Sequence, residues 1–237
     1  NVEKHSSDIV AITASQFQIS RQAVNKHIKL LVEQKAILVK GATRSRRYSL
    51  HPLIEWSNSY DLENKLEEDV VWQQDISKFL KELPDNVRDI WHYGFTEMLN
   101  NAIDHSSGSR VIIHIEKTAS TTNIMIIDDG EGIFKKIQRE LGLSDERHSV
   151  LELAKGKLTT DPNHHSGEGI FFSSRMFDRF AISSGSTDFS HEFDKTEDWI
   201  IEHKENKSGT AVFMYLSNNS SRTSKGVFDN FTSNDDY

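Results

Sequence analysis

The sequence has 237 residues, of which 36% are hydrophobic and 27% charged, proportions that are ordinary for a globular protein. It contains no cysteine, which excludes disulfide frameworks and thiolate metal sites, and no apolar run of the roughly 18 residues that a membrane span needs. No secretory signal opens it, so we expect a cytoplasmic protein without a membrane partner. The net charge of −8 hides an asymmetry, because residues 1–51 carry +6 and the remainder −14. The basic head, rather than the body, is therefore expected to meet a polyanion.

The basic head, residues 1–51, has the pattern of short helices followed by a small hairpin. Ser7 and Asp8 can cap a first helix, and Ser20 can cap a second one in which apolar residues recur at helical spacing. Two short extended stretches then flank Gly41. This order of elements predicts a winged helix-turn-helix.

A connector is expected at residues 52–66, and the body, residues 67–216, mixes helical and extended patterns. Helices are predicted from apolar spacing near 3.6 residues and strands from runs dense in Ile and Val. The predicted helices cover residues 66–83, 85–105, 133–141 and 168–178, and the predicted strands cover residues 110–116, 123–127, 180–183, 199–203 and 210–216. Residues 217–237 are rich in Ser, Asn, Asp and Thr, and their lack of apolar periodicity predicts a linker.

Two segments of the body carry a pattern suited to a nucleotide and its metal ion. Glu97 and Asn101 lie four residues apart on one face of the long predicted helix, where a carboxylate and an amide oxygen could hold water and Mg2+. A solvated helix face is the alternative. Asp128 leaves an apolar strand before Gly130 and Gly132, so the backbone can approach a planar ligand while the carboxylate accepts from an exocyclic amine such as that of adenine. A plain strand-to-helix turn would have the same sequence.

Two further segments suit phosphate groups. The stretch 164–170 contains two glycines and opens a helix, whose free N–H groups form an anion site. Gly209 and Thr210 enter the last predicted strand, where the hydroxyl group can meet the nucleotide. Taken singly, each segment is also typical of a loop that caps a helix or leads into a strand.

In their sequence order, these four segments resemble the N, G1, G2 and G3 boxes of the GHKL ATPase superfamily. That superfamily includes gyrase, heat-shock chaperones of the ninety-kilodalton class, sensor histidine kinases, MutL proteins and bacterial anti-sigma-factor kinases. The resemblance covers about residues 70–216. It implies an α+β chain in which the winged helix-turn-helix precedes a Bergerat-fold two-layer α/β sandwich with a mixed sheet, and it implies ATP and Mg2+ as ligands.

The resemblance also implies roles for individual residues. Asn101 resembles the asparagine that coordinates Mg2+, Glu97 the carboxylate that orients or activates the attacking group, and Asp128 the aspartate that reads adenine. The other residues implied to contact the nucleotide are Asp104, His105, Gly130, Gly132, Ile133, His165, Ser166, Gly167, Glu168, Gly169, Ile170 and Thr210. The polar stretch 144–166 then resembles the mobile lid over the nucleotide.

The sequence departs from the superfamily at points that bear on catalysis. Asp104 stands where histidine kinases often carry a basic residue, and His165 stands where many G2 boxes have a glycine. His92 lacks the flanking acidic residue and proline of a phosphoacceptor box, so we do not expect a self-contained histidine kinase. We also expect no counterpart of the lysine that gyrase and MutL proteins add from a following domain. Hydrolysis is therefore expected to be slow or to need further parts, since phosphoryl transfer depends on positioning and charge stabilisation.

The second helix of the head resembles the recognition helix of winged helix-turn-helix regulators. It would turn Arg21, Gln22, Asn25 and Lys26 outward, with side chains suited to base edges and phosphates. On the presumed wing, three cationic side chains are expected to neutralise phosphates: Arg44, Arg46 and Arg47. A winged-helix module used for protein contacts is the alternative.

A DNA-binding head joined to a GHKL body resembles a group of prokaryotic regulators in which a small STAS-like domain follows the ATPase domain. Residues 165–172 and 227–229 look like the corresponding stretches of those proteins. We expect the sequence to end where that domain would begin, and a STAS-like protein or domain to be a partner. A homodimer fits this class, because helix-turn-helix proteins often pair on symmetric DNA sites.

The sequence therefore predicts a regulator that couples Mg-ATP binding, or slow hydrolysis, to DNA binding. Two alternatives stay open. The protein could be a serine/threonine kinase of the anti-sigma type that acts on a STAS-like partner, or a non-catalytic module that senses ATP without turnover.

Overall fold

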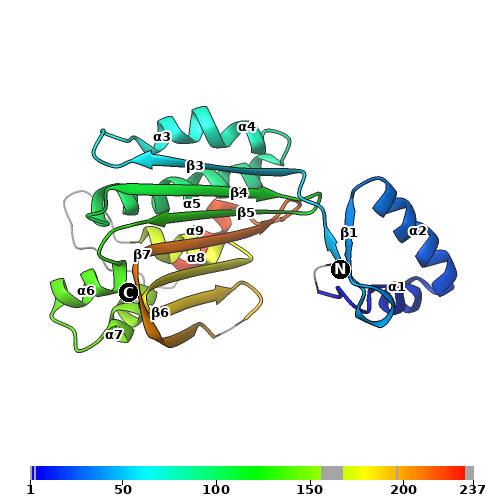
Figure 1. The fold of residues 1–237 in the computed structure, drawn as a ribbon. Helices are drawn as coiled ribbons and strands as arrows, with labels where there is room; N and C mark the ends of the chain where they lie inside the picture. The colour runs from blue at the N-terminus through cyan, green and yellow to red at the C-terminus, as the bar shows by residue number, and fades with distance from the viewer. Residues whose placement is uncertain (1, 3, 156–167, 196, 233–237) are drawn as a thin grey trace. The chain divides into compact units, whose positions relative to one another are not determined.

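The computed structural model describes residues 2, 4–155, 168–195 and 197–232 (Figure 1). They form two compact units, each of which combines helices with antiparallel strands. The first unit is Asn1–Ile54 with Lys117–Ala119, and the second is Glu55–Glu116 with Ser120–Tyr237. The predicted α+β class is confirmed.

The head folds as two helices followed by a hairpin, in the predicted order. Its elements are α1 (Ile9–Phe17), α2 (Arg21–Glu33), β1 (Ile37–Lys40), the 3-10 turn η1 (Thr43–Ser45) and β2 (Arg47–Leu50), which pairs antiparallel with β1. The hydroxyl oxygen of Ser20 accepts a hydrogen bond from the Ala23 N–H at 3.1 Å and so caps α2, as predicted. Asp8, in contrast, makes no side-chain cap bond at the start of α1. The small core of the unit consists of Ile9, Val24, Ile28, Ile37 and Tyr48.

The body is built on one five-stranded sheet with the strand order β3-β4-β5-β7-β6. These strands are β3 (Ile54–Asp61), β4 (Arg110–Lys117), β5 (Thr121–Asp128), β6 (Arg179–Glu192) and β7 (Trp199–Ser217). Strand β7 runs antiparallel to both of its neighbours, β5 and β6. The Leu53 N–H bonds to the Lys117 carbonyl and the Leu62 N–H to the Ser109 carbonyl, so β3 runs antiparallel to β4. The prediction of a mixed sheet is therefore wrong. It came from the resemblance, because the apolar pattern of a strand carries no information on strand direction.

Strand β3 lies in the segment 52–66, for which the sequence predicts a connector. The ring of Trp56 packs against that of Phe79 with 5.6 Å between centroids, and the Tyr60 hydroxyl donates to Asp75 at 2.6 Å. The residues between the two aromatic rings are Ser and Asn. This polar composition concealed the alternation of a half-buried edge strand.

Helices cover one face of the sheet and one of its ends (Figure 1). They are α3 (Glu68–Val71), the π-helical turn η2 (Trp72–Ile76), α4 (Ser77–Leu80), α5 (Asp85–His105), α6 (Ile133–Leu141), α7 (Glu146–Ala154), α8 (Gly169–Met176) and α9 (Ser224–Thr232). The first three form one helical run where the sequence predicts a single helix. Under the helices, β5 and β7 bury alternate side chains, including Ile124, Ile126, Val212 and Met214. The main core of the protein therefore lies between this face and α5.

Helix α9 occupies residues for which the sequence predicts a linker. Val227 is 4% exposed, the ring of Phe228 lies 4.6 Å from that of Phe172, and the ring of Phe231 lies 5.4 Å from that of Phe171. Three apolar residues at helical spacing thus join the core of the body. The surrounding Ser, Asn and Asp residues hid this short pattern.

Candidate functional site

Asp128, the last residue of β5, is a buried carboxylate held by backbone donors. It is 7% exposed and pairs in the sheet with Thr210 of β7. Its Oδ1 accepts hydrogen bonds from the N–H groups of Gly130 at 2.9 Å and Thr210 at 3.2 Å. Burial raises the pKa of Asp128, because a low dielectric disfavours the charged form, and the two backbone donors partly oppose this effect.

Two glycines let three chain segments meet beside this carboxylate. A Cβ on Gly130 would overlap the carbonyl oxygen of Ser106, which follows α5, and a Cβ on Gly209 would overlap the carbonyl oxygen of Asp128. Gly209 also has a φ of +76°, which favours glycine. Because both lack a side chain, the Gly209 N–H can bond to the Gly130 carbonyl at 2.9 Å.

Two hydroxyl groups tie the start of α6 and strand β6 to the same point. The Thr210 Oγ1 accepts from the N–H of Ile133, the first residue of α6, at 3.0 Å. The Ser184 hydroxyl of β6 donates to the Gly209 carbonyl at 3.0 Å. The segment before Thr210 is thereby fixed on both sides.

A cavity lies between α5 and the sheet, next to Asp128. The residues that line it come from six elements and the turn after α5: Met98, Asn101, Ala102, His105, Ser106, Ile126, Asp128, Ile133, Ile170, Ile182, Thr210 and Val212. The structure therefore brings together six of the residues that the sequence singles out: Asn101, His105, Asp128, Ile133, Ile170 and Thr210. These six are spread over more than a hundred residues of the chain.

The cavity is narrow and mostly apolar. It encloses about 30 Å³, room for a water molecule, whereas pockets for small ligands typically span about 300–1,000 Å³. A nucleoside could therefore enter only if the walls moved apart. The wall formed by α8 continues directly into residues 156–167, which lie outside the described part of the chain.

Glu97 does not line the cavity but faces the start of α8, one helical turn away from Asn101. A Cβ on Gly169, the first residue of α8, would overlap the Glu97 carboxylate, so the two groups lie in direct proximity. Burial raises the pKa of the Tyr93 phenol, and the negative charges of Glu97 and Glu168 raise it further. Two carboxylates thus gather where α5 meets α8.

The remaining predicted site residues take other positions. Asp104 is exposed on α5 and does not line the cavity. Gly132 directly precedes α6, has a φ of +93° and lies close to the Ser184 hydroxyl. The predictions for His165, Ser166 and Gly167 fall outside the described residues.

Asp129 is a structural carboxylate that the sequence analysis did not single out. Its oxygens accept from the N–H groups of Ser109 at 2.8 Å and Arg110 at 2.9 Å and from the Ser109 hydroxyl at 2.9 Å. Hydrogen bonds from Arg110 and Ser109 lower the pKa of Asp129. The two adjacent aspartates therefore have different roles. Asp129 links the end of β5 to the start of β4 through hydrogen bonds, and Asp128 faces the cavity.

Lys136 of α6 is a second residue that the sequence analysis missed. Its ammonium group donates to the carbonyl of His105 at 2.9 Å, at the C-terminal end of α5, where a cation is favoured by the helix dipole. Nothing in the spacing of α6 indicates this contact. It depends on the tertiary packing of α6 against the end of α5.

The stretch 144–166, predicted as a mobile lid, begins with a packed helix. Within α7, Val150 and Leu153 are buried, and the Glu146 carboxylate accepts from both the N–H and the hydroxyl of Ser186 at 3.2 and 3.3 Å. That carboxylate lies beside a bulge of β6 at Gly185. Residues 146–154 of the expected lid therefore form a helix that apolar residues and an acidic anchor hold on the body, and the prediction for residues 156–166 falls outside the described residues.

The head exposes the side chains that the sequence assigns to nucleic-acid contact. Helix α2 buries Val24 and Ile28 and leaves Arg21, Gln22, Asn25 and Lys26 exposed. In and next to the turn between β1 and β2, Arg44, Arg46 and Arg47 are exposed as well. The exposed surface of the unit thus carries cations and amide groups on α2 and on the β1–β2 hairpin.

Comparison with known proteins gives no family for the chain: no protein-family model and no curated protein matches it. In the described part of the chain, no helix is long and apolar enough to cross a membrane. The same residues contain no group of three or more His, Asp or Glu side chains placed to hold a metal ion.

Proposed function

We propose that the body binds ATP with Mg2+ at the cavity beside Asp128, as an ATP-binding domain of the GHKL type. The observation that carries this proposal is the convergence of Asn101, Asp128, Ile170 and Thr210 around one cavity. Each comes from a different one of the four motif segments. Segments so far apart in sequence meet by folding, and their combination is more specific than any of them alone.

The chemistry of the cavity suits a purine. Its walls are largely aliphatic, with Ile126, Ile133, Ile170 and Ile182 around one buried carboxylate. Apolar walls with a few convergent polar groups are typical of small-molecule sites. The Asp128 carboxylate would accept from the exocyclic amine of adenine, while the aliphatic side chains cover the ring faces.

The polyphosphate and its metal ion fit the neighbouring part of α5 and α8. Mg2+ takes oxygen ligands and keeps several waters, so the amide oxygen of Asn101 would complete a coordination sphere supplied mainly by phosphates. The free N–H groups at the start of α8 suit phosphate oxygens. Glu97, which faces Gly169, would orient the attacking group if ATP is turned over.

For the head we propose binding to DNA through α2 and the β1–β2 turn. The support is the local charge of +6 over residues 1–51 together with the exposure of Arg21, Lys26 and Arg46. The combined proposal is a regulator in which ATP binding by the body changes the DNA affinity of the head. Such coupling requires that ATP bind two conformations of the protein unequally.

The direct test is calorimetric titration of the protein with ATP at several Mg2+ concentrations. In Asp128→Asn an acceptor oxygen becomes an N–H donor, so we expect affinity to fall about tenfold or more, the effect of losing a charge-assisted hydrogen bond. In Asn101→Ala, binding should lose most of its Mg2+ dependence. Asp194→Asn, which removes an exposed carboxylate in the β6–β7 turn, is the matched control.

Equal ATP affinity of the wild type and Asp128→Asn would contradict the proposed adenine contact. An absence of binding at millimolar ATP would reject the nucleotide site as a whole. In that case the basic surface of the head would remain the main evidence on function.

A further inference from the structure

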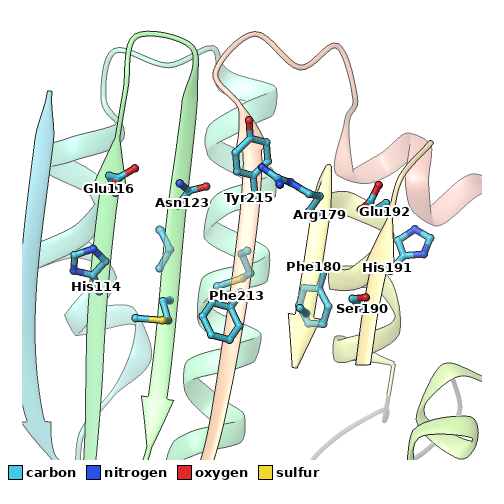
Figure 2. A pocket seen from close by; sticks show the side chains of 14 residues that line it. His114, Glu116, Asn123, Arg179, Phe180, Ser190, His191, Glu192, Phe213 and Tyr215 are labelled. Atoms are coloured by element: carbon cyan, nitrogen blue, oxygen red, sulfur yellow. The ribbon is translucent and has the colours of Figure 1, made fainter. Parts of the chain in front are cut away.

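Helix α9, Ser224–Thr232, lies on the helical side of the sheet, next to α8 (Figure 1). Figure 2 shows the opposite side, where side chains such as Phe213 and Tyr215 project from the sheet and the helices lie behind the strands. On the helical side, α8 contributes Ile170 to the lining of the cavity beside Asp128. A helix that contacts α8 is therefore placed to affect that cavity.

Aromatic rings hold α9 on α8 and α5. The ring of Phe228 lies 4.6 Å from that of Phe172 of α8 and 5.3 Å from that of Tyr93 of α5. The ring of Phe231 lies 5.4 Å from that of Phe171 of α8. Such ring pairs stabilise a contact beyond the apolar area that they bury. Helix α9 therefore packs specifically where α5 meets α8.

These contacts fall on the side of α8 that is turned away from the cavity. Successive side chains of an α-helix are rotated by about 100° around its axis. Phe171 and Phe172 therefore project at about 100° and 200° from Ile170, which lines the cavity. The middle of the α9 contact lies roughly 150° from Ile170, almost diametrically opposite. Helix α8 thus stands between the cavity and α9.

The segment that leads into α9 has its own attachment to the body. The side-chain amide of Asn86 on α5 donates to the carbonyls of Ser220 and Arg222 at 2.8 and 2.6 Å. The guanidinium group of Arg222 in turn donates to the Met176 carbonyl and the Asp178 carboxylate. A release of α9 from α8 would leave all these bonds in place.

The cavity beside Asp128 has to widen before a nucleoside can enter it, because it encloses about 30 Å³. Strands β5 and β7 cannot easily give way, since they are joined by a continuous ladder of pairs from Thr121 to Asp128. Helix α5 has 21 residues and buries side chains along its whole length, whereas α8 has only eight residues. The wall that we expect to move is therefore α8.

We propose that α9 is an autoinhibitory helix that holds α8 against the cavity, so that ATP binding and the docking of α9 oppose each other. This inference rests on the nucleotide site proposed above. Outward movement of α8 would push Phe171 and Phe172 into the rings of α9, so α9 has to shift or leave. Because a coupling free energy is reciprocal, loss of the α9 contacts raises ATP affinity by the factor by which ATP weakens the docking of α9.

Calorimetric titration with ATP and Mg2+ tests the effect of α9 on affinity. Phe231→Ala removes the ring that contacts Phe171 and should raise ATP affinity about fivefold or more, the lower end of typical couplings between sites. Phe79→Ala is the matched control, because it removes a partly buried ring that packs on Trp56 of the edge strand β3. This control should leave ATP affinity unchanged. Circular dichroism checks that both variants are folded.

Hydrogen–deuterium exchange of the wild type tests the effect of ATP on α9 and does not depend on the folding of a variant. Addition of ATP with Mg2+ should speed the exchange of amide groups in residues 224–232 about fivefold or more, because the helix opens more often when it is released from α8. Residues 110–117 of β4 lie outside the moving wall and serve as the internal control, with unchanged exchange.

The outcomes separate this inference from the proposed function. If the wild type binds ATP and Phe231→Ala binds it equally or more weakly, the autoinhibitory role is wrong and the nucleotide site stands. Exchange in residues 224–232 that stays constant or slows when ATP binds would lead to the same conclusion. If neither protein binds ATP at millimolar concentration, the nucleotide site is rejected and the inference falls with it. Binding by Phe231→Ala alone would support both.

Discussion

At the scale of single residues, the candidate site depends on two glycines, because any side chain at these positions would keep the surrounding segments apart. Gly130 and Gly209 allow the turn after β5, the middle of β7 and the end of α5 to lie in contact around Asp128. Any Cβ at Gly130 would meet a backbone carbonyl, which cannot move aside as a flexible side chain can. The close approach is thus a property of the backbone rather than of a specific side chain.

We expect Gly130→Ala to lower the free energy of unfolding by about 2–3 kcal/mol, the upper part of the range for forcing an atom into a packed region. Gly142→Ala provides a matched comparison, because Gly142 ends α6 with a φ of +63° and has no atom within 4 Å of the added Cβ. There only the left-handed backbone is unfavourable, at about 1 kcal/mol. Urea unfolding measures both effects, and equal losses would show that the contact with Ser106 is unimportant.

The sequence pointed to site residues only at positions where the local pattern itself is unusual. Asp128 and Gly130 stand out because an aspartate and a glycine follow an apolar strand. Asp129 has the same local sequence, yet it bonds to Ser109 and serves a structural role. Which of two adjacent carboxylates faces a cavity depends on the pleat of β5 and on what packs above it, and neither is visible in a motif.

At the scale of elements, one partly buried ionic cluster joins α8 to the β6–β7 hairpin. Arg175 of α8 donates to both oxygens of Asp198 at 3.0 and 3.1 Å, and His191 of β6 lies 2.6 Å from the same carboxylate. Burial acts to raise the pKa of Asp198, but the hydrogen bonds from His191 and Arg175 outweigh it and hold the pKa at about 2. This carboxylate therefore stabilises the folded state as an anion.

The depressed pKa fixes the direction of a pH effect. The unfolded chain has an Asp198 pKa near 3.8, so the stabilisation is complete above that value and is lost as pH falls towards 2. We expect Asp198→Asn to lower the free energy of unfolding at pH 7 by about 1–3 kcal/mol, the range for hydrogen bonds to a charged group. The difference from the wild type should shrink between pH 4 and pH 2 in urea unfolding series.

The neighbouring exposed carboxylate offers a control for this prediction. Glu197→Gln removes a charge one residue away without touching the cluster, and we expect little change in stability at either pH. A loss in Asp198→Asn that is the same at pH 7 and near pH 2 would contradict an ionic role.

The elements that the sequence predicted share strong local signals. The bounds of α5 match because Pro84 sets its start, and β4 and β5 were found from dense Ile and Val. Strand β6 was predicted only over residues 180–183, because its continuation is rich in Ser and small residues and buries them through contact with α6 and α7. The elements that the sequence did not predict, including α9, owe their structure to tertiary contacts more than to local preference.

At the scale of the whole molecule, the two units differ in the sign of their charge. The head, residues 1–51, carries +6 and the rest of the chain −14. A polyanion would therefore be drawn to one unit and repelled by the other. If the head binds DNA as proposed, this separation would favour contact through the head rather than through the acidic body.

The salt dependence of DNA binding tests the proposed role of the head. If Arg46 contacts a phosphate, Arg46→Ala should weaken binding to all sequences alike and reduce the slope of log affinity against log salt concentration by about 1. Fluorescence anisotropy at several salt concentrations gives this slope. Lys81→Ala, an exposed cation of the body, should leave it unchanged. A wild type that does not bind DNA at low salt would reject the proposal.

The register of β5 has a consequence for the position of the buried carboxylate. All eight residues of β5, Thr121–Asp128, pair with residues of β7, and Asp128 is the last of them. A slip of one residue would move every side chain of the strand to the other face of the sheet. The whole β5–β7 ladder therefore fixes where the Asp128 carboxylate lies along the strand.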